Sequence, residues 1–100
     1  MKTLPIYLPR AEIEQFCQRN CIRKLSLFGS VLRDDFTAQS DVDVLVEFAF
    51  GKTPGWSIVT MENELSHLLG RMVDLRTPAE LSRYFRSAVL QEAMVIYDQN

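Results

Sequence analysis

The sequence predicts an α/β fold in which a small mixed β-sheet packs with helices. Short apolar runs with strand periodicity alternate along the chain with longer segments whose apolar residues recur at helical spacing. No repeat or low-complexity stretch interrupts this alternation. A chain of 100 residues buries one modest hydrophobic core, so we expect a single domain over residues 1–100 and no second substrate-binding domain.

The first half of the chain should contain a helix, two strands and a turn between the strands. Pro9 marks the start of the helix, because proline is favoured near the first helical position, and Ile13, Phe16 and Cys17 should face the core. The expected elements are a helix at 9–19, a strand at 25–28, a short helix or turn at 30–34 and a strand at 41–48.

The second half should contain a long helix, a short strand and a closing segment. Ile58, Met61 and Leu65 recur at helical spacing, and Gly70 is a natural stop for that helix. The expected elements are a loop at 51–55, a helix at 58–69, a strand at 72–76, an amphipathic segment at 81–91 and a last strand or helix end at 94–97.

Two aspartates, Asp41 and Asp43, open the strand at 41–48 and share one of its faces, because strand side chains alternate with a period of two. The valines between and after them, together with Phe48, form the opposite, core-facing side. Two carboxylates this close are costly to ionise together unless a cation or a strong set of donors lies between them. Mg²⁺ takes one or two carboxylates plus substrate phosphates, and a pair of ions roughly 3.5–4 Å apart stabilises in-line displacement at phosphorus. The pattern therefore indicates a polyphosphate substrate.

Gly29 and Ser30 follow the strand at 25–28 and form a second candidate feature. Gly29 lets the backbone approach a ligand closely, Ser30 adds a hydroxyl, and the free N–H groups of a strand-to-helix turn attract anions such as a triphosphate. A Gly-Ser pair is usually only a turn, and Asp-x-Asp is common in loops. Their combination is much more specific than either part.

Asp74 lies in the apolar strand at 72–76 and shares a face with Met72 and Arg76. A carboxylate buried in such a run costs free energy unless it has a partner. If this strand neighbours the strand at 41–48, three carboxylates converge. The alternative is a salt bridge from Asp74 to Arg71 or Arg76.

The string Phe28-Gly29-Ser30, followed after ten residues by Asp41-Val42-Asp43, resembles the G-S-x10-D-x-D signature of the DNA polymerase beta-like nucleotidyltransferase superfamily. More narrowly, the chain resembles minimal nucleotidyltransferase domains of the MntA type, which are antitoxin partners of HEPN toxins. The likeness covers nearly the whole chain and extends through residues 33–36, 51–55, 68–75 and 90–93. Asp34 departs from it, because many relatives have glycine there.

This resemblance implies a minimal polymerase beta-like fold and a Mg²⁺-dependent nucleotidyltransferase. The implied reaction moves AMP from ATP to a tyrosine hydroxyl of a cognate HEPN ribonuclease toxin, which is silenced. It implies that Asp41 and Asp43 contact both metal ions, and that Asp74 ligates the catalytic ion and helps to deprotonate the attacking hydroxyl. Gly29 and Ser30 would then cradle the triphosphate.

Arg33 is a candidate phosphate ligand, since its fork of donors follows the Gly29-Ser30 turn, although most loop charges are simply solvated.

Two other functions stay open. One is a binding antitoxin, which would block its partner in a stoichiometric complex. The apolar segment 84–97 is compatible with this alternative, because it is either core or partner surface. Transfer to a small molecule such as an aminoglycoside is disfavoured, because related enzymes of that kind have two lobes.

Charge and hydropathy narrow the class of partner. A net charge of −2 and a pI near 5.3 argue against broad nucleic-acid binding, which needs a basic stripe. No apolar run approaches the roughly 18 residues of a membrane span and the N-terminus lacks the layout of a signal peptide, so we expect a cytoplasmic protein.

The remaining metal-ligating side chains have ordinary explanations. Cys17 and Cys21 are too few for a disulfide framework or a zinc site, and His67 should be solvated on the polar side of its helix. Glu47 lies on the face of Asp43 but farther along the strand, where we expect a solvated or salt-bridged strand end.

Overall fold

The computed structural model describes residues 4–51 and 57–99. Its elements are, in order, α1 (Arg10–Arg19), β1 (Ile22–Phe28), the 3₁₀ helix η1 (Gly29–Leu32), β2 (Val42–Phe48), α2 (Ile58–Leu69), β3 (Val73–Arg76), the 3₁₀ helix η3 (Pro78–Glu80), α3 (Arg86–Glu92) and β4 (Met94–Asp98). The predicted α/β class is confirmed. Most of the loop expected at 51–55 lies outside the described residues.

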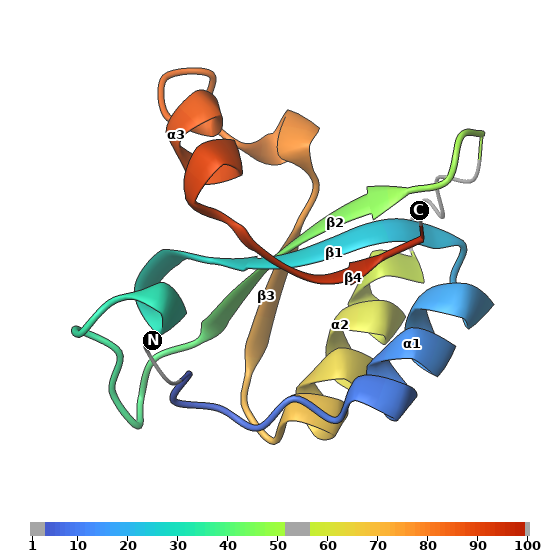
Figure 1. The fold of residues 1–100 in the computed structure, drawn as a ribbon, viewed down its shortest axis with the longest axis horizontal. Helices are drawn as coiled ribbons and strands as arrows, with labels where there is room; N and C mark the ends of the chain where they lie inside the picture. Colours follow the sequence, from blue (N-terminus) through green and yellow to red (C-terminus); the bar gives the residue numbers. More distant parts are fainter. Residues whose placement is uncertain (1–3, 52–56, 100) are drawn as a thin grey trace.

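The four strands form one mixed sheet in the order β3-β2-β1-β4. β1 pairs antiparallel with both β2 and β4, whereas β2 and β3 are parallel. Parallel neighbours need a crossover connection, and α2 lies in the one between β2 and β3 (Figure 1). The sheet therefore changes from antiparallel to parallel pairing at β2, which is the strand that follows Asp41.

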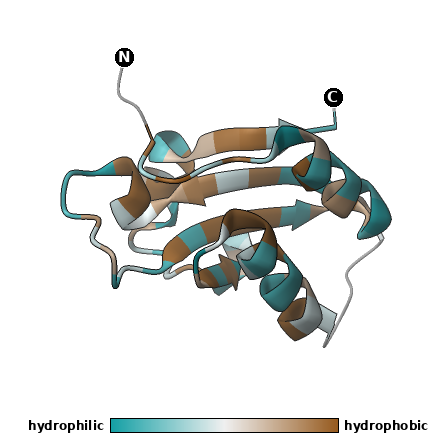
Figure 2. Ribbon diagram, turned by 90° about the horizontal axis from the view of Figure 1, so that it is seen from below, coloured by the Kyte–Doolittle hydropathy of each residue, from teal (hydrophilic) through white to brown (hydrophobic). Residues whose placement is uncertain are grey.

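Helices α1 and α2 cover one face of the sheet, and α3 lies on the opposite side (Figure 1). Each helix of the first pair buries one stripe: Ile13, Phe16 and Cys17 in α1 have at most 1% of their surface exposed. The core between these helices and the sheet consists of Ile13, Phe16, Cys17, Ile22, Leu25, Leu27, Val31, Val42, Val44, Val46, Met61, Leu65, Leu69, Val73, Leu75 and Ile96. Figure 2 shows hydrophobic residues along the strands and a mixture of hydrophobic and hydrophilic residues along these helices.

Helix α2 ends where the sequence predicts. Gly70 is its C-cap and adopts the left-handed conformation, with φ of +67°, and its N–H donates to the carbonyl of Ser66. The next N–H, that of Arg71, donates to the same carbonyl. This turn reverses the chain and delivers it to β3.

Strand β1 is longer than predicted, because it begins at Ile22 rather than Leu25. Its first residues include Arg23 and Lys24, whose charges hid the strand in the sequence. The added length is paired on both sides: Ile22 lies opposite Phe48 of β2, and Lys24 lies opposite Asp98 of β4. Pairing with two neighbours therefore overrides the local sequence pattern.

The amphipathic segment predicted at 81–91 is helical only at its end. The carbonyl of Ser82 accepts the N–H groups of Phe85 and Arg86, so the chain forms a turn before α3 begins at Arg86. α3 buries none of its residues. The last element, predicted as a strand or a helix end, is the strand β4.

The apolar segment 84–97 divides between core and surface. Ile96 is 7% exposed and belongs to the core, and Tyr97 packs against that core. In contrast, large apolar side chains of this segment are exposed: Tyr84, Phe85, Leu90, Met94 and Val95. Among the helices of the described residues, none has the length and apolar character needed to cross a membrane.

Candidate active site

Strand β2 holds Asp43 on the face opposite to α1 and α2. Val42, Val44 and Val46 are fully buried in the core, while Asp43 between them is half-buried. Asp41 is exposed and precedes the first residue of β2, so the strand begins one residue later than predicted. The alternation that the sequence predicted from Val42 onward is confirmed, and it fixes the direction of Asp43.

Asp43 and Asp74 are direct neighbours. The parallel pairing of β2 with β3 places them in register, so the predicted adjacency of the two strands is confirmed. Burial raises the pKa of the Asp43 carboxyl above its ordinary value, and the negative charges of Asp74 and Asp41 raise it further. Arg33 and Arg76 act in the opposite direction. The three aspartates therefore share one electrostatic environment.

Gly29 lies against the carboxylate of Asp43. It follows Phe28, which pairs with Asp43 across β1 and β2, and its φ of +76° lies in the left-handed region. A Cβ atom on Gly29 would overlap Oδ2 of Asp43. Only glycine meets both conditions without strain. The contact seen in the structure is with an aspartate, whereas the approach of Gly29 to a ligand stays a prediction. Ser30 follows in η1.

Asp74 forms the salt bridge that the sequence left open as an alternative. Its partner is Arg76, whose Nε lies 3.0 Å from Oδ1 and whose Nη2 lies 3.4 Å from Oδ2. Both oxygens of Asp74 are therefore engaged. The pair is partly exposed, with 48% of the Arg76 side chain and 37% of the Asp74 side chain accessible.

The donor chemistry of these aspartates fits Mg²⁺, although their arrangement is not a closed site. Carboxylate oxygens are the ligands that Mg²⁺ prefers, and a cation beside Asp43 would relieve the charge that raises its pKa. Within residues 4–51 and 57–99, no group of three or more His, Cys, Asp or Glu side chains is arranged to hold a metal ion. The salt bridge to Arg76 occupies Asp74 in this arrangement.

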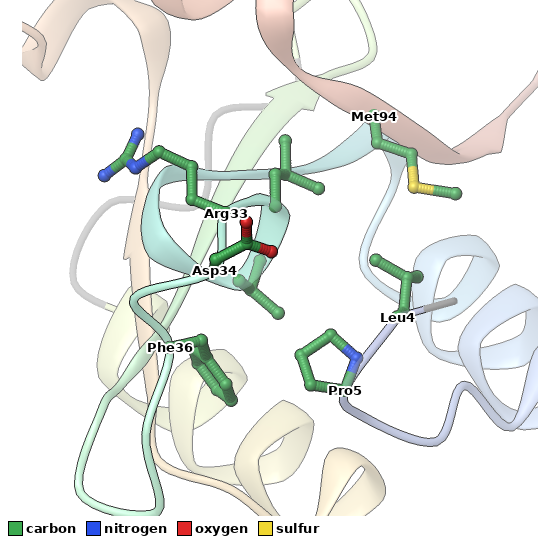
Figure 3. Close-up of a pocket in the computed structure, with 8 residues that line it drawn as sticks. Leu4, Pro5, Arg33, Asp34, Phe36 and Met94 are labelled. Carbon is green, nitrogen blue, oxygen red and sulfur yellow. The ribbon is translucent and has the colours of Figure 1, made fainter. Parts of the chain in front are cut away.

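Arg33 lies at the edge of this environment. Its Nε is 3.6 Å from Oδ1 of Asp35, and both side chains are more than half exposed. It also borders a cavity of about 330 Å³ between η1, the N-terminal segment and β4. Figure 3 shows the Arg33 side chain extending away from Leu4 and Pro5, which lie across that cavity. The other lining residues are Val31, Leu32, Asp34, Phe36 and Met94.

Two arginines near the carboxylates were not predicted as site residues. Arg76 shares a strand face with Asp74, and that parity was the sequence signal for it. Arg71 instead binds the segment before Asp41, and nothing local in the sequence indicates this, because its acceptors lie 31 and 34 residues away.

The explanations given for Glu47 and His67 agree with the structure. Glu47 forms a salt bridge with Arg23 at 2.7 Å, and His67 is exposed. Cys17 and Cys21 are free thiols, the first buried and the second exposed.

Comparison with known proteins places the chain in a family. A sequence profile described as the nucleotidyltransferase domain matches residues 10–97. The chain belongs to the nucleotidyltransferase domain family. The protein adenylyltransferase MntA of Thermococcus cleftensis is 31% identical over 87 residues, which cover 86% of each chain. The predicted resemblance to MntA-type nucleotidyltransferases, and with it the prediction of an enzyme, is confirmed.

Solved structures of other proteins share the fold. A structure described as a minimal nucleotidyltransferase superposes with a TM-score of 0.70 at 33% identity, covering 85% of this chain and 86% of the other. A toxin-antitoxin structure with AMP-PNP gives a TM-score of 0.71 at 20% identity, covering 91% of this chain and 74% of the other. The second likeness concerns the fold alone.

Proposed function

We propose that this nucleotidyltransferase is a protein adenylyltransferase that silences a cognate HEPN ribonuclease toxin by moving AMP from ATP to a tyrosine hydroxyl. The observation that carries the proposal is the register of Asp43 with Asp74, with Gly29 packed against the Asp43 carboxylate. Relatives at about one-third identity or just below carry the name of protein adenylyltransferases, which supports a protein acceptor.

In the proposed reaction, Asp41, Asp43 and Asp74 hold Mg²⁺, as two ions, through their carboxylate oxygens. A bound Mg²⁺ supplies positive charge that offsets the carboxylates and stabilises charge on the phosphate oxygens. Gly29 and Ser30 support the triphosphate, and Arg33 donates hydrogen bonds to it. Arg33 is suited to this because its side chain is more than half exposed and its charge already acts on Asp43.

Asp74 prepares the acceptor in this scheme. The tyrosine oxygen attacks the α-phosphorus of ATP, the bond to the pyrophosphate oxygen breaks, and pyrophosphate leaves with the electron pair. Asp74 accepts the hydroxyl proton, which requires that Arg76 release at least one of its oxygens. The described residues form one hydrophobic core, and in this proposal the partner protein carries the acceptor tyrosine to the three aspartates.

The test is the intact mass of the partner protein after incubation with this chain, ATP and Mg²⁺. We expect one or more AMP units to be added by the wild type and none by the Asp41→Ala, Asp43→Ala double variant. Glu64→Ala is the matched control, because it removes a carboxylate that pairs with Arg19 between the two helices, on the face of the sheet away from Asp43. Transfer that persists in the double variant would reject the assignment of these aspartates.

A second candidate is the binding antitoxin, which neutralises its partner by complex formation. It is favoured by the exposed apolar side chains around α3, since a seven-residue helix that buries none of its residues gains little stability from its own packing. This candidate predicts that the double variant still neutralises the toxin and still forms a stoichiometric complex with it. Neutralisation that is lost together with AMP transfer would exclude it.

A further inference from the structure

We infer that Arg71 is a positioning residue that fixes Asp41 at the active site. Asp41 is exposed and lies outside β2, so neither burial nor the sheet holds it in place. The inference rests on the proposed function in one respect, namely that Asp41 binds the metal ion. It adds a residue that the site motifs do not contain.

The Arg71 guanidinium binds the segment that leads into Asp41 at three points. Its Nη2 donates to the carbonyl oxygens of Thr37 and Ser40, at 2.8 and 2.7 Å. Its Cζ lies 4.5 Å from the centroid of the Phe36 ring, which is a cation-π distance. Ser40 is the residue immediately before Asp41, so one of these bonds acts directly on the backbone of the aspartate.

Segment 36–40 is compact enough to transmit this restraint. The Ser40 N–H donates to the carbonyl of Thr37 at 3.1 Å, and the Thr37 N–H donates to the Ser40 hydroxyl at 2.9 Å. These bonds close a turn, and the Arg71 side chain adds a second donor to the Thr37 carbonyl and one donor to the Ser40 carbonyl. A restraint on the turn is therefore a restraint on Ser40 and on the residue that follows.

The two residues 71 and 72 bracket Asp41 on both sides. Arg71 holds the carbonyl of Ser40, and the carbonyl of Met72 accepts the N–H of Val42 at 2.8 Å. The first bond comes from a side chain and the second from the backbone, so only the first is removed by substitution. The left-handed turn at Gly70 places Arg71 where this is possible.

Removing Arg71 should affect the position of Asp41 more than the stability of the fold. The Thr37 and Ser40 carbonyls are partly accessible, so water replaces the guanidinium when Arg71 is removed, and the fold loses little. The segment before Asp41 then keeps only the hydrogen bonds within its own turn and loses its connection to residue 71. Groups that orient metal ligands from behind typically change metal affinity by about 10–100-fold.

The test measures Mn²⁺ binding by the electron paramagnetic resonance of the free ion, alongside thermal unfolding. We expect Arg71→Ala to bind Mn²⁺ about tenfold more weakly than wild type at temperatures well below its unfolding midpoint, with Arg71→Lys in between. Arg19→Ala is the matched control, because Arg19 is another arginine with a hydrogen-bonded partner, but it lies on α1 and pairs with Glu64.

The outcomes distinguish this inference from the function on which it rests. If wild type does not bind Mn²⁺, the proposed metal site fails first. If wild type binds and a folded Arg71→Ala binds equally well, Arg71 is only a structural residue and the inference is overturned. Should Arg71→Ala fail to fold, Arg71→Lys is judged by the same criterion, since lysine cannot reproduce the planar fork over Phe36. A normal unfolding midpoint with weakened binding supports the positioning role.

Discussion

Replacing Gly29 with alanine tests the contact at the centre of the site. The backbone at Gly29 has a φ of +76°, and a side chain in this left-handed region costs about 1–2 kcal/mol. The new methyl group would also overlap Oδ2 of Asp43, so the carboxylate must move at a further cost of about 1–3 kcal/mol. We therefore expect Gly29→Ala to lower the free energy of unfolding by about 2–5 kcal/mol and to abolish AMP transfer.

Gly51→Ala is the matched control. Gly51 has a similar φ of +75°, but a Cβ there meets no atom within 4 Å. It should lose only the backbone contribution, about 1–2 kcal/mol, and keep full activity. Urea unfolding gives both stabilities, and the partner's intact mass gives transfer. Equal losses of stability in the two variants, together with normal transfer by Gly29→Ala, would refute the argument that Gly29 is required by the Asp43 carboxylate.

The remaining predictions concern charge and burial. In EDTA at pH 7, Asp43→Asn should raise the unfolding midpoint in calorimetry, because it removes a carboxyl whose pKa is raised by burial and by neighbouring aspartates. The gain should vanish in acid, where wild-type Asp43 is protonated, and a lower midpoint for the variant at pH 7 would contradict the prediction. Arg76→Ala should raise the pKa of Asp43 further, and carboxyl ¹³C chemical shifts measure that pKa; an unchanged pKa would contradict the prediction. The same variant should lower the free energy of unfolding by less than about 1 kcal/mol, since the ion pair of Arg76 with Asp74 is partly exposed. Iodoacetamide at pH 8 should label only Cys21 in the folded chain, because burial raises the pKa of Cys17 to about 12. Labelling of both thiols in the native chain would reject this. Above pH 9 the Cys17 thiol ionises in the unfolded state before it ionises in the folded state, so the free energy of unfolding should fall between pH 9 and about pH 12.

The sequence predicted those parts of the fold that follow from local periodicity. The alternation beginning at Val42 placed Asp43 correctly, and the spacing of apolar residues with Gly70 at its end placed α2 within its observed bounds, Ile58–Leu69. Both patterns record which side of one element faces the core, and that is determined within a few residues.

Other features depend on residues distant in the sequence and were missed for that reason. The first three residues of β1 are strand because β2 and β4 pair with them, although they include charged side chains. α3 is shorter than its apolar pattern predicts: it begins only at Arg86 and buries none of its residues, so little packing supports a longer helix. The contacts of Arg71 span more than 30 residues, and no local pattern encodes them.

Asp43 has two energetically unfavourable neighbours, and their presence at one residue argues for a functional role. On one side its neighbour is a glycine held in the left-handed region, and on the other it is paired in register with Asp74. A stable fold does not need the paired aspartates, since an apolar residue at position 43 would remove both the desolvation and the repulsion that raise the pKa of Asp43. Natural sequences keep such local conflicts mainly where a ligand resolves them. Here the conflict is an excess of negative charge, and a cation with its bound phosphates is what would resolve it.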